Sequence, residues 1–178
     1  MSTTVSAAHD EKAYQLMEQL SLALWYERAG EVNDQTEERL KQFFSKLQVE
    51  NVDIEWATKE ETAQLITEFT FENSAVWDKL KDLPDQLKEK IEKNNKQEQM
   101  EDIIDRAPEL IYLRTFDRAY ELFQDEKLIK YLVVHAMYVS VLACVAALAE
   151  DDLFNPIVEM IEEGHIPLGI KENTVYLL

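Results

Sequence analysis

The sequence predicts a mainly α-helical protein, in which a single-domain bundle surrounds a buried apolar central helix at residues 131–149 and a small β-hairpin lies at the C-terminus. The 178 residues include only three glycines and four prolines, too few for the frequent turns of a β-sandwich or barrel. A hydrophobic content of 46% is too high for a disordered chain, and the length suits one domain with a substantial core.

Two amphipathic helices are expected near the N-terminus. Apolar residues recur at steps of three and four from Asp10 to Ala29, and Gly30 provides a C-terminal stop. The same period follows Thr36 as far as Leu47 and predicts the second helix.

The next segments combine a strand signal with three helix starts. Apolar and acidic residues alternate in VDIEW, residues 52–56, as in a short half-buried strand. The helix starts are a capping box of Thr58 and Glu61 before a helix reaching Phe69 or Glu72, a cap at Ser74, and Pro84 at a first helical position. The polar residues 93–99 then form a connection, either a loop within one domain or the boundary between two small lobes.

The C-terminal half begins with a helix near residues 100–106 and a second one opened by Pro108. After the apolar helix, a short helix begins at Asn155 and ends at Gly164. Alternating apolar residues on both sides of KENT, residues 171–174, predict the hairpin. Because an isolated hairpin is marginally stable, it must lie on the helices or pair with residues 52–56.

The apolar helix is long enough to raise the question of a membrane. Its nineteen uncharged residues nearly span a bilayer core, at a rise of about 1.5 Å per residue against roughly 30 Å. However, several positions are polar, and at least five other helices carry apolar stripes that need a partner. A helix that is apolar on all sides suits the centre of a bundle, so the sequence favours burial without a membrane.

Net charge and cysteine content limit the classes of function. Eighteen basic and thirty-six acidic residues give a net charge of −18, which repels nucleic-acid phosphates and attracts basic surfaces. The single Cys144 excludes an internal disulfide and is expected to be a small buried hydrophobe. No secretory leader is recognised at the N-terminus, so a cytoplasmic location is the default expectation.

The most distinctive polar cluster belongs to the central helix. Tyr131, His135 and Tyr138 fall within about 60° of one another around its axis. A buried imidazole between two phenols could bind a small polar ligand or titrate near neutral pH, or it could be a core histidine with satisfied hydrogen bonds. Arg114 and Arg118 are the closest arginine pair and could anchor an anion for this pocket.

A second candidate site is an acidic surface at the end of the central helix. Residues 131–178 contain seven acids and one base. The candidate residues for docking a basic protein are Asp151, Asp152, Glu159, Glu162 and Glu163.

Two further patterns have structural alternatives. Glu162 and His165 have the spacing of di-iron carboxylate bundles, but the motif occurs once and Gly164 breaks the helix, so no metal or other cofactor is predicted. The aromatic stripe of Tyr112, Phe116, Tyr120 and Phe123 predicts core packing or an oligomer interface. A homodimer could form through this stripe or through the edge of the hairpin.

These observations leave two principal hypotheses, because the chain contains no phosphate loop, dinucleotide fingerprint or serine-hydrolase elbow. The first is a non-enzymatic module of the inhibitor, immunity or adaptor type that docks a basic partner. The alternative is a ligand-binding protein or enzyme with a pocket at Tyr131, His135 and Tyr138.

Overall fold

The computed structural model describes residues 2–70 and 74–178, with side chains from Asp10 onwards. Within these residues the helices are α1 (Ser2–Ser21), α2 (Asp34–Lys46), α3 (Thr62–Leu65), α4 (Ala75–Leu80), α5 (Leu83–Lys93), α6 (Gln97–Leu122), α7 (Glu126–Leu148) and α8 (Asn155–Glu162). The strands are β1 (Asp53–Trp56), β2 (Pro167–Lys171) and β3 (Thr174–Leu177). The predicted class, a mainly helical single domain with a small β element, is confirmed.

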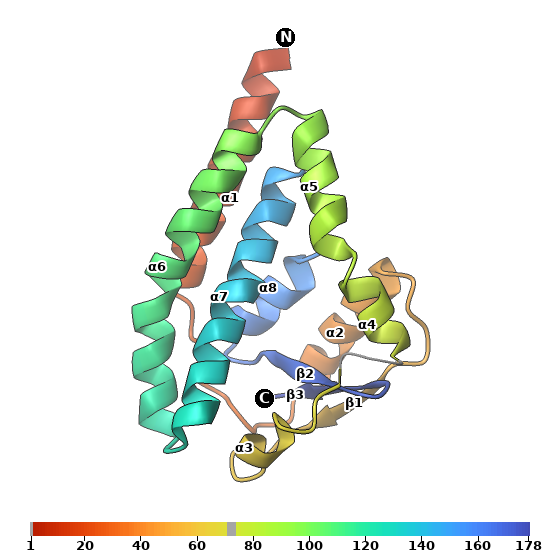
Figure 1. Cartoon of the computed structure of the whole chain (residues 1–178), viewed down its shortest axis with the longest axis vertical. Coiled ribbons are helices and arrows are strands. Elements are labelled where there is room, and N and C mark those ends of the chain that lie inside the picture. The colour runs from red at the N-terminus through yellow and green to blue at the C-terminus, as the bar shows by residue number, and fades with distance from the viewer. Residues whose placement is uncertain (1, 71–73) are drawn as a thin grey trace.

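Helix α7 is the centre of the bundle, as the uncharged run predicts. It packs against α1 and α6 on one side and α5 on another, and the sheet lies near its N-terminal end (Figure 1). It begins five residues before the expected 131, because Asp125 caps it by accepting a hydrogen bond of 2.8 Å from the amide of Leu128. By length and composition α7 could cross a membrane, but neighbouring helices bury its C-terminal half, including Ala143, Ala146 and Leu148.

The C-terminal hairpin forms and pairs with the predicted strand near residue 54. The strand order is β1-β3-β2, with β1 parallel to β3 and β2 antiparallel to it. Ile54 is opposite Val175, and the buried side chains of Val175 and Leu177 face the helices. Strand β1 therefore supplies the third strand that an isolated hairpin lacks.

Two helix predictions are wrong. The first helix ends at Ser21, not Ala29, because residues 22–30 form turns in which the Trp25 indole donates to the Leu20 carbonyl at 2.8 Å and Tyr26 has a left-handed backbone. The two helices expected around Pro108 form the single helix α6, which contains that proline. Proline removes one backbone donor, and packing of α6 along α7 and α1 keeps the remaining turns helical.

Two other predicted helix-start signals form in the structure. Thr58 and Glu61 form the reciprocal capping-box bonds at 3.1 and 3.3 Å, and Ser74 caps α4. Helix α3 nevertheless ends at Leu65, and Glu72 lies outside the described residues. The N-cap of α2 is Asn33 rather than Thr36. The connection expected at 93–99 is a short turn, residues 94–96, between α5 and α6.

Candidate functional site

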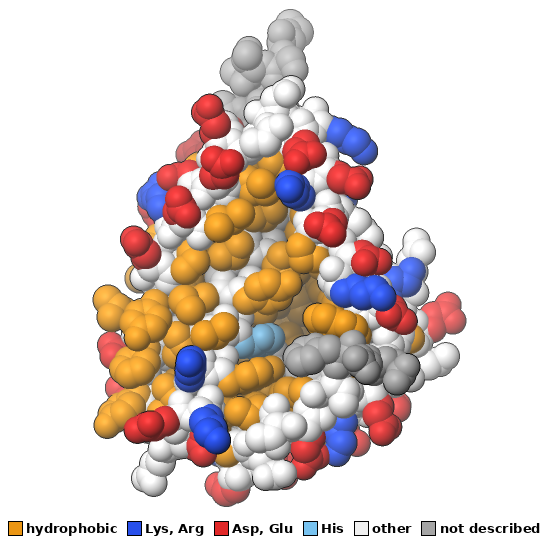
Figure 2. Space-filling view, viewed as in Figure 1, with side chains coloured by type: hydrophobic (Ala, Val, Ile, Leu, Met, Phe, Trp, Pro, Cys, Tyr) orange, Lys and Arg blue, Asp and Glu red, His pale blue; other side chains and the backbone are white. Residues whose placement is uncertain are grey.

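A large apolar cavity lies against the N-terminal two-thirds of α7. Its volume is about 640 Å³, and its walls come from α2, α4, α5, α8, the segment after α3 and the sheet. Figure 2 shows hydrophobic side chains gathered around this hollow. The apolar wall residues include Leu40, Phe43, Phe69, Leu80 and Ile157. Segments far apart in the sequence thus enclose one site.

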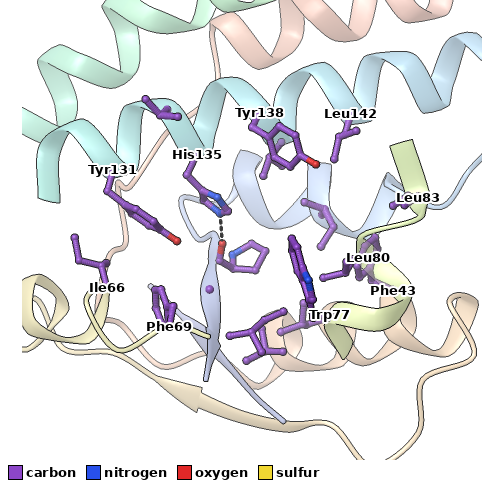
Figure 3. Close-up of a pocket in the computed structure, with 18 of the residues that line it drawn as sticks. Phe43, Ile66, Phe69, Trp77, Leu80, Leu83, Tyr131, His135, Tyr138 and Leu142 are labelled. Atoms are coloured by element: carbon purple, nitrogen blue, oxygen red, sulfur yellow. Dashed lines mark hydrogen bonds between the residues drawn. The ribbon is translucent and has the colours of Figure 1, made fainter. Parts of the chain in front are cut away.

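The three predicted pocket residues are brought together on the cavity wall. Tyr131, His135 and Tyr138 project from consecutive turns of α7 into the space that Figure 3 shows. The Tyr131 hydroxyl donates to the Leu168 carbonyl at 2.6 Å, and the rings of Tyr131 and His135 are stacked with centroids 5.7 Å apart. Burial raises the pKa of Tyr131 to about 12, so its phenol is neutral at pH 7.

His135 has a defined neutral form. Its Nε2 lies 2.6 Å from the Pro167 carbonyl oxygen, which can only accept, so Nε2 carries the proton. Burial lowers the pKa of His135 in spite of this hydrogen bond. The other nitrogen, Nδ1, is then an acceptor, and no described residue donates to it. Together with the Tyr138 hydroxyl, the wall offers one acceptor and one donor to a ligand.

Two lysines that sequence reasoning missed complete the polar edge of the cavity. Lys127 lines it one turn before Tyr131 and Lys130 one turn before Val134, and both lysine side chains are exposed. Neither ammonium group forms an ion pair with a residue in the described part of the chain. The available signal is their spacing, because Lys127 lies four residues before Tyr131 and Lys130 lies four residues before Val134, so each shares a face of α7 with a residue of the cavity wall.

Arg114 and Arg118 do not belong to this cavity. Both lie on α6, where Arg118 is held by Glu27 at 2.5 Å and Glu121 at 2.8 Å. Arg114 is exposed on the same helix and does not line the cavity. The lysines of α7, not the arginines of α6, are the cations beside Tyr131 and His135.

The five candidate docking acids are all engaged within the molecule. Asp151 pairs with Lys90, Asp152 with Lys46 at 3.1 Å, Glu159 and Glu163 with Arg39, and Glu162 accepts from Gln19. Burial opposes ionisation of Asp151, but hydrogen bonds from Lys90 and the Leu153 amide bring its pKa below the usual value. The charge of these acidic side chains is therefore partly neutralised by basic side chains from other helices.

Glu162 and His165 do not converge on a metal site. His165 is buried, its Nε2 donates to the Glu31 carbonyl at 2.9 Å, and its Nδ1 accepts from the Thr36 hydroxyl at 3.0 Å. Both ring nitrogens are thereby used. Across the described residues, no group of three or more His, Cys, Asp or Glu side chains could hold a metal ion.

The aromatic stripe of α6 is divided between surface and core. Phe123 is buried, but Tyr112, Phe116 and Tyr120 are exposed by 44%, 37% and 68% and stack on one another with centroids about 6 Å apart. The core interpretation is thus wrong for these three rings, and the homodimer stays a prediction. Cys144 is fully buried, which raises the pKa of its thiol to about 12.

A comparison of the chain with protein-family models, with curated proteins and with solved structures finds no match. The assignment of function therefore depends on the geometry of the site alone.

Proposed function

We propose that this protein binds a small, mainly apolar molecule in the cavity beside α7. The observation that carries the proposal is a cavity of about 640 Å³ with apolar walls and a few polar groups on one helix. Ligand pockets typically have this size and this combination, in which apolar walls provide affinity and a few polar groups fix orientation.

The size of the cavity argues against a packing defect. Protein interiors rarely contain voids larger than a water molecule. As a sealed empty void, 640 Å³ would cost roughly 15 kcal/mol, which is the upper limit of the stability of a typical domain. Such a space is tolerated when it opens to solvent or is filled by a ligand.

The groups on α7 fit binding better than catalysis. Neutral His135 and Tyr131 are both held by backbone carbonyls of the β2 strand, which fixes their orientation. Cys144 is buried, has a raised pKa and does not line the cavity. Ser140 also lies outside its lining, so the cavity wall offers no activated nucleophile among the described residues.

Docking of a basic protein partner by a cytoplasmic module remains a second prediction. The net charge of −18 favours it, whereas the internal pairing of Asp151, Asp152, Glu159, Glu162 and Glu163 weakens it. Replacing these five acids by their amides should slow association with such a partner at low salt.

The cavity is tested with the neutral, polarity-sensitive dye Nile red. We expect saturable fluorescence enhancement with the wild-type protein and its loss in Leu142→Trp, which fills the cavity. Leu113→Trp is the matched control, since Leu113 is 66% exposed on α6 and lies outside the lining. If Leu142→Trp fails to fold by circular dichroism, Val134→Trp replaces it, because Val134 is exposed yet lines the cavity. Equal dye binding by the cavity-filling variant and the control would overturn the proposal.

A further inference from the structure

We infer that the ligand is a free long-chain fatty acid, whose carboxylate lies between Lys127 and Lys130 and whose chain follows α7 into the cavity. This inference rests on the proposed function and specifies the class of ligand. It is carried by the uneven distribution of charge along one wall of the cavity, together with the length of that wall.

The polar and apolar ends of the wall are separated along α7. Lys127 and Lys130 precede Tyr131 at one end. At the other end Leu142 lies on α7, and Leu80, Leu83 and Phe43 line the same end of the cavity from other helices (Figure 3). No acidic side chain lines the cavity among the described residues. An amphiphile with a single anionic head group matches this polarity, and a cationic one opposes it.

The two lysines are available for an external anion. Several other lysines are neutralised within the molecule, for example Lys46 by Asp152 and Lys171 by Glu68. Lys127 and Lys130 form no such pair with the described residues, although the chain has twice as many acids as bases. A ligand carboxylate could accept from both ammonium groups.

The length of the wall sets the length of the chain. Lys127 and Leu142 are fifteen residues apart on α7, which corresponds to roughly 22 Å along the axis. With carbon–carbon bonds of about 1.5 Å at near-tetrahedral angles, each carbon adds roughly 1.25 Å. A chain of about 18 carbons therefore covers this distance, and a chain of about 15 carbons covers the roughly 18 Å from Lys130 to Leu142. The volume of about 640 Å³ is within the range of a single small ligand and thus favours one chain over a two-chain lipid.

The test is displacement of Nile red at pH 8 by tetradecanoate, tetradecan-1-ol, tetradecylamine and octanoate. We expect tetradecanoate to bind about tenfold more tightly than the alcohol, because two partly exposed ion pairs each contribute modestly. The amine and the shorter octanoate should be weaker than tetradecanoate.

The matched variants distinguish the contribution of the ligand's head group to affinity from that of its hydrocarbon chain. Lys127→Gln/Lys130→Gln should weaken tetradecanoate about tenfold and leave the alcohol unchanged. Lys12→Gln/Lys93→Gln removes the same charge from two exposed helical lysines outside the cavity and should change neither. Equal binding of acid and alcohol in every variant would overturn this inference and leave the apolar site standing. If Nile red itself fails to bind as proposed, both proposals fall.

Discussion

His135 and His165 belong to the same fold and have opposite surroundings. His165 is buried and uses both ring nitrogens, one on the Thr36 hydroxyl and one on the Glu31 carbonyl. His135 uses one nitrogen on the Pro167 carbonyl and faces a cavity of about 640 Å³. A histidine with two internal partners connects elements of the fold, whereas one with a free acceptor beside a cavity can also recognise a ligand.

The largest difference between them should appear in stability. His165→Leu leaves the buried Thr36 hydroxyl and the Glu31 carbonyl without partners, so we expect the free energy of unfolding to fall by about 3 kcal/mol. His135→Leu removes one bond at the cavity edge and should cost about 1 kcal/mol. Urea unfolding measures both. Equal losses would contradict the contrast.

Changing the cavity wall should reduce both ligand binding and stability. A methyl group at Gly169 would lie 2.4 Å from Cδ2 of Phe69, whose ring lines the cavity and must then shift. Gly169→Ala should therefore cost about 1–2 kcal/mol of stability and weaken Nile red several-fold. Gly30→Ala is the control for dye binding, since Gly30 lies outside the cavity; its φ of 81° makes this substitution destabilising as well, so dye affinity is the quantity compared. Unchanged dye affinity in Gly169→Ala would show that Phe69 does not shape the site.

A smaller effect is expected from the phenol beside His135. Tyr131→Phe deletes the hydroxyl that donates to the Leu168 carbonyl but keeps the ring that stacks on His135. The loss should be about 1 kcal/mol in urea unfolding. Tyr138→Phe provides the comparison, because no described residue bonds to its exposed hydroxyl and its stability should not change. Similar losses in both variants would argue against the Tyr131 bond.

The pH dependence of stability should come from both histidines. Burial lowers the pKa of each in the folded state, so the unfolded chain binds more protons once the pH falls below about 6.5. The contribution of the two neutral histidines to the free energy of unfolding is fully present above that pH. It decreases as the pH falls towards their lower pKa values in the folded state. Urea midpoints between pH 8 and 5 test this, and the decrease should be smaller in His165→Leu. A midpoint that rises as the pH falls through 6.5 would contradict the signs of these shifts.

The architecture could be predicted from local patterns, while the cavity could not. The uncharged run fixed the central helix because no other segment can fill the middle of the bundle, and alternation at 52–56 identified β1. Whether Pro108 ends a helix or lies within one depends on the helices that pack against α6. The local sequence pattern does not contain this information. The cavity walls combine residues as distant as Phe43, Trp77 and Ile157, and nothing in the spacing of these residues indicates a space between them.

The sequence predicts the three aromatic side chains of the candidate site but not its cations. Tyr131, His135 and Tyr138 share one helix, so helical geometry alone placed them on one face. The sequence favours Arg114 and Arg118 as the anion anchor because they are close together in the chain. This prediction is wrong, since closeness in sequence says nothing about the distance between two helices. Lys127 and Lys130 lie in the charged segment before the apolar run. They line the cavity because the sheet packs beside this end of α7, and the sequence pattern does not predict that packing.

The most direct test compares the imidazole NMR signals of the two histidines before and after addition of a ligand. Protein labelled at histidine is titrated with tetradecan-1-ol, which tests the cavity independently of the lysines, and the signals are assigned with His135→Leu and His165→Leu. We expect the His135 signals to shift in a saturable manner while those of His165 stay in place. Shifts of His165 alone, equal shifts of both, or no shift at a saturating concentration would contradict a ligand site beside α7.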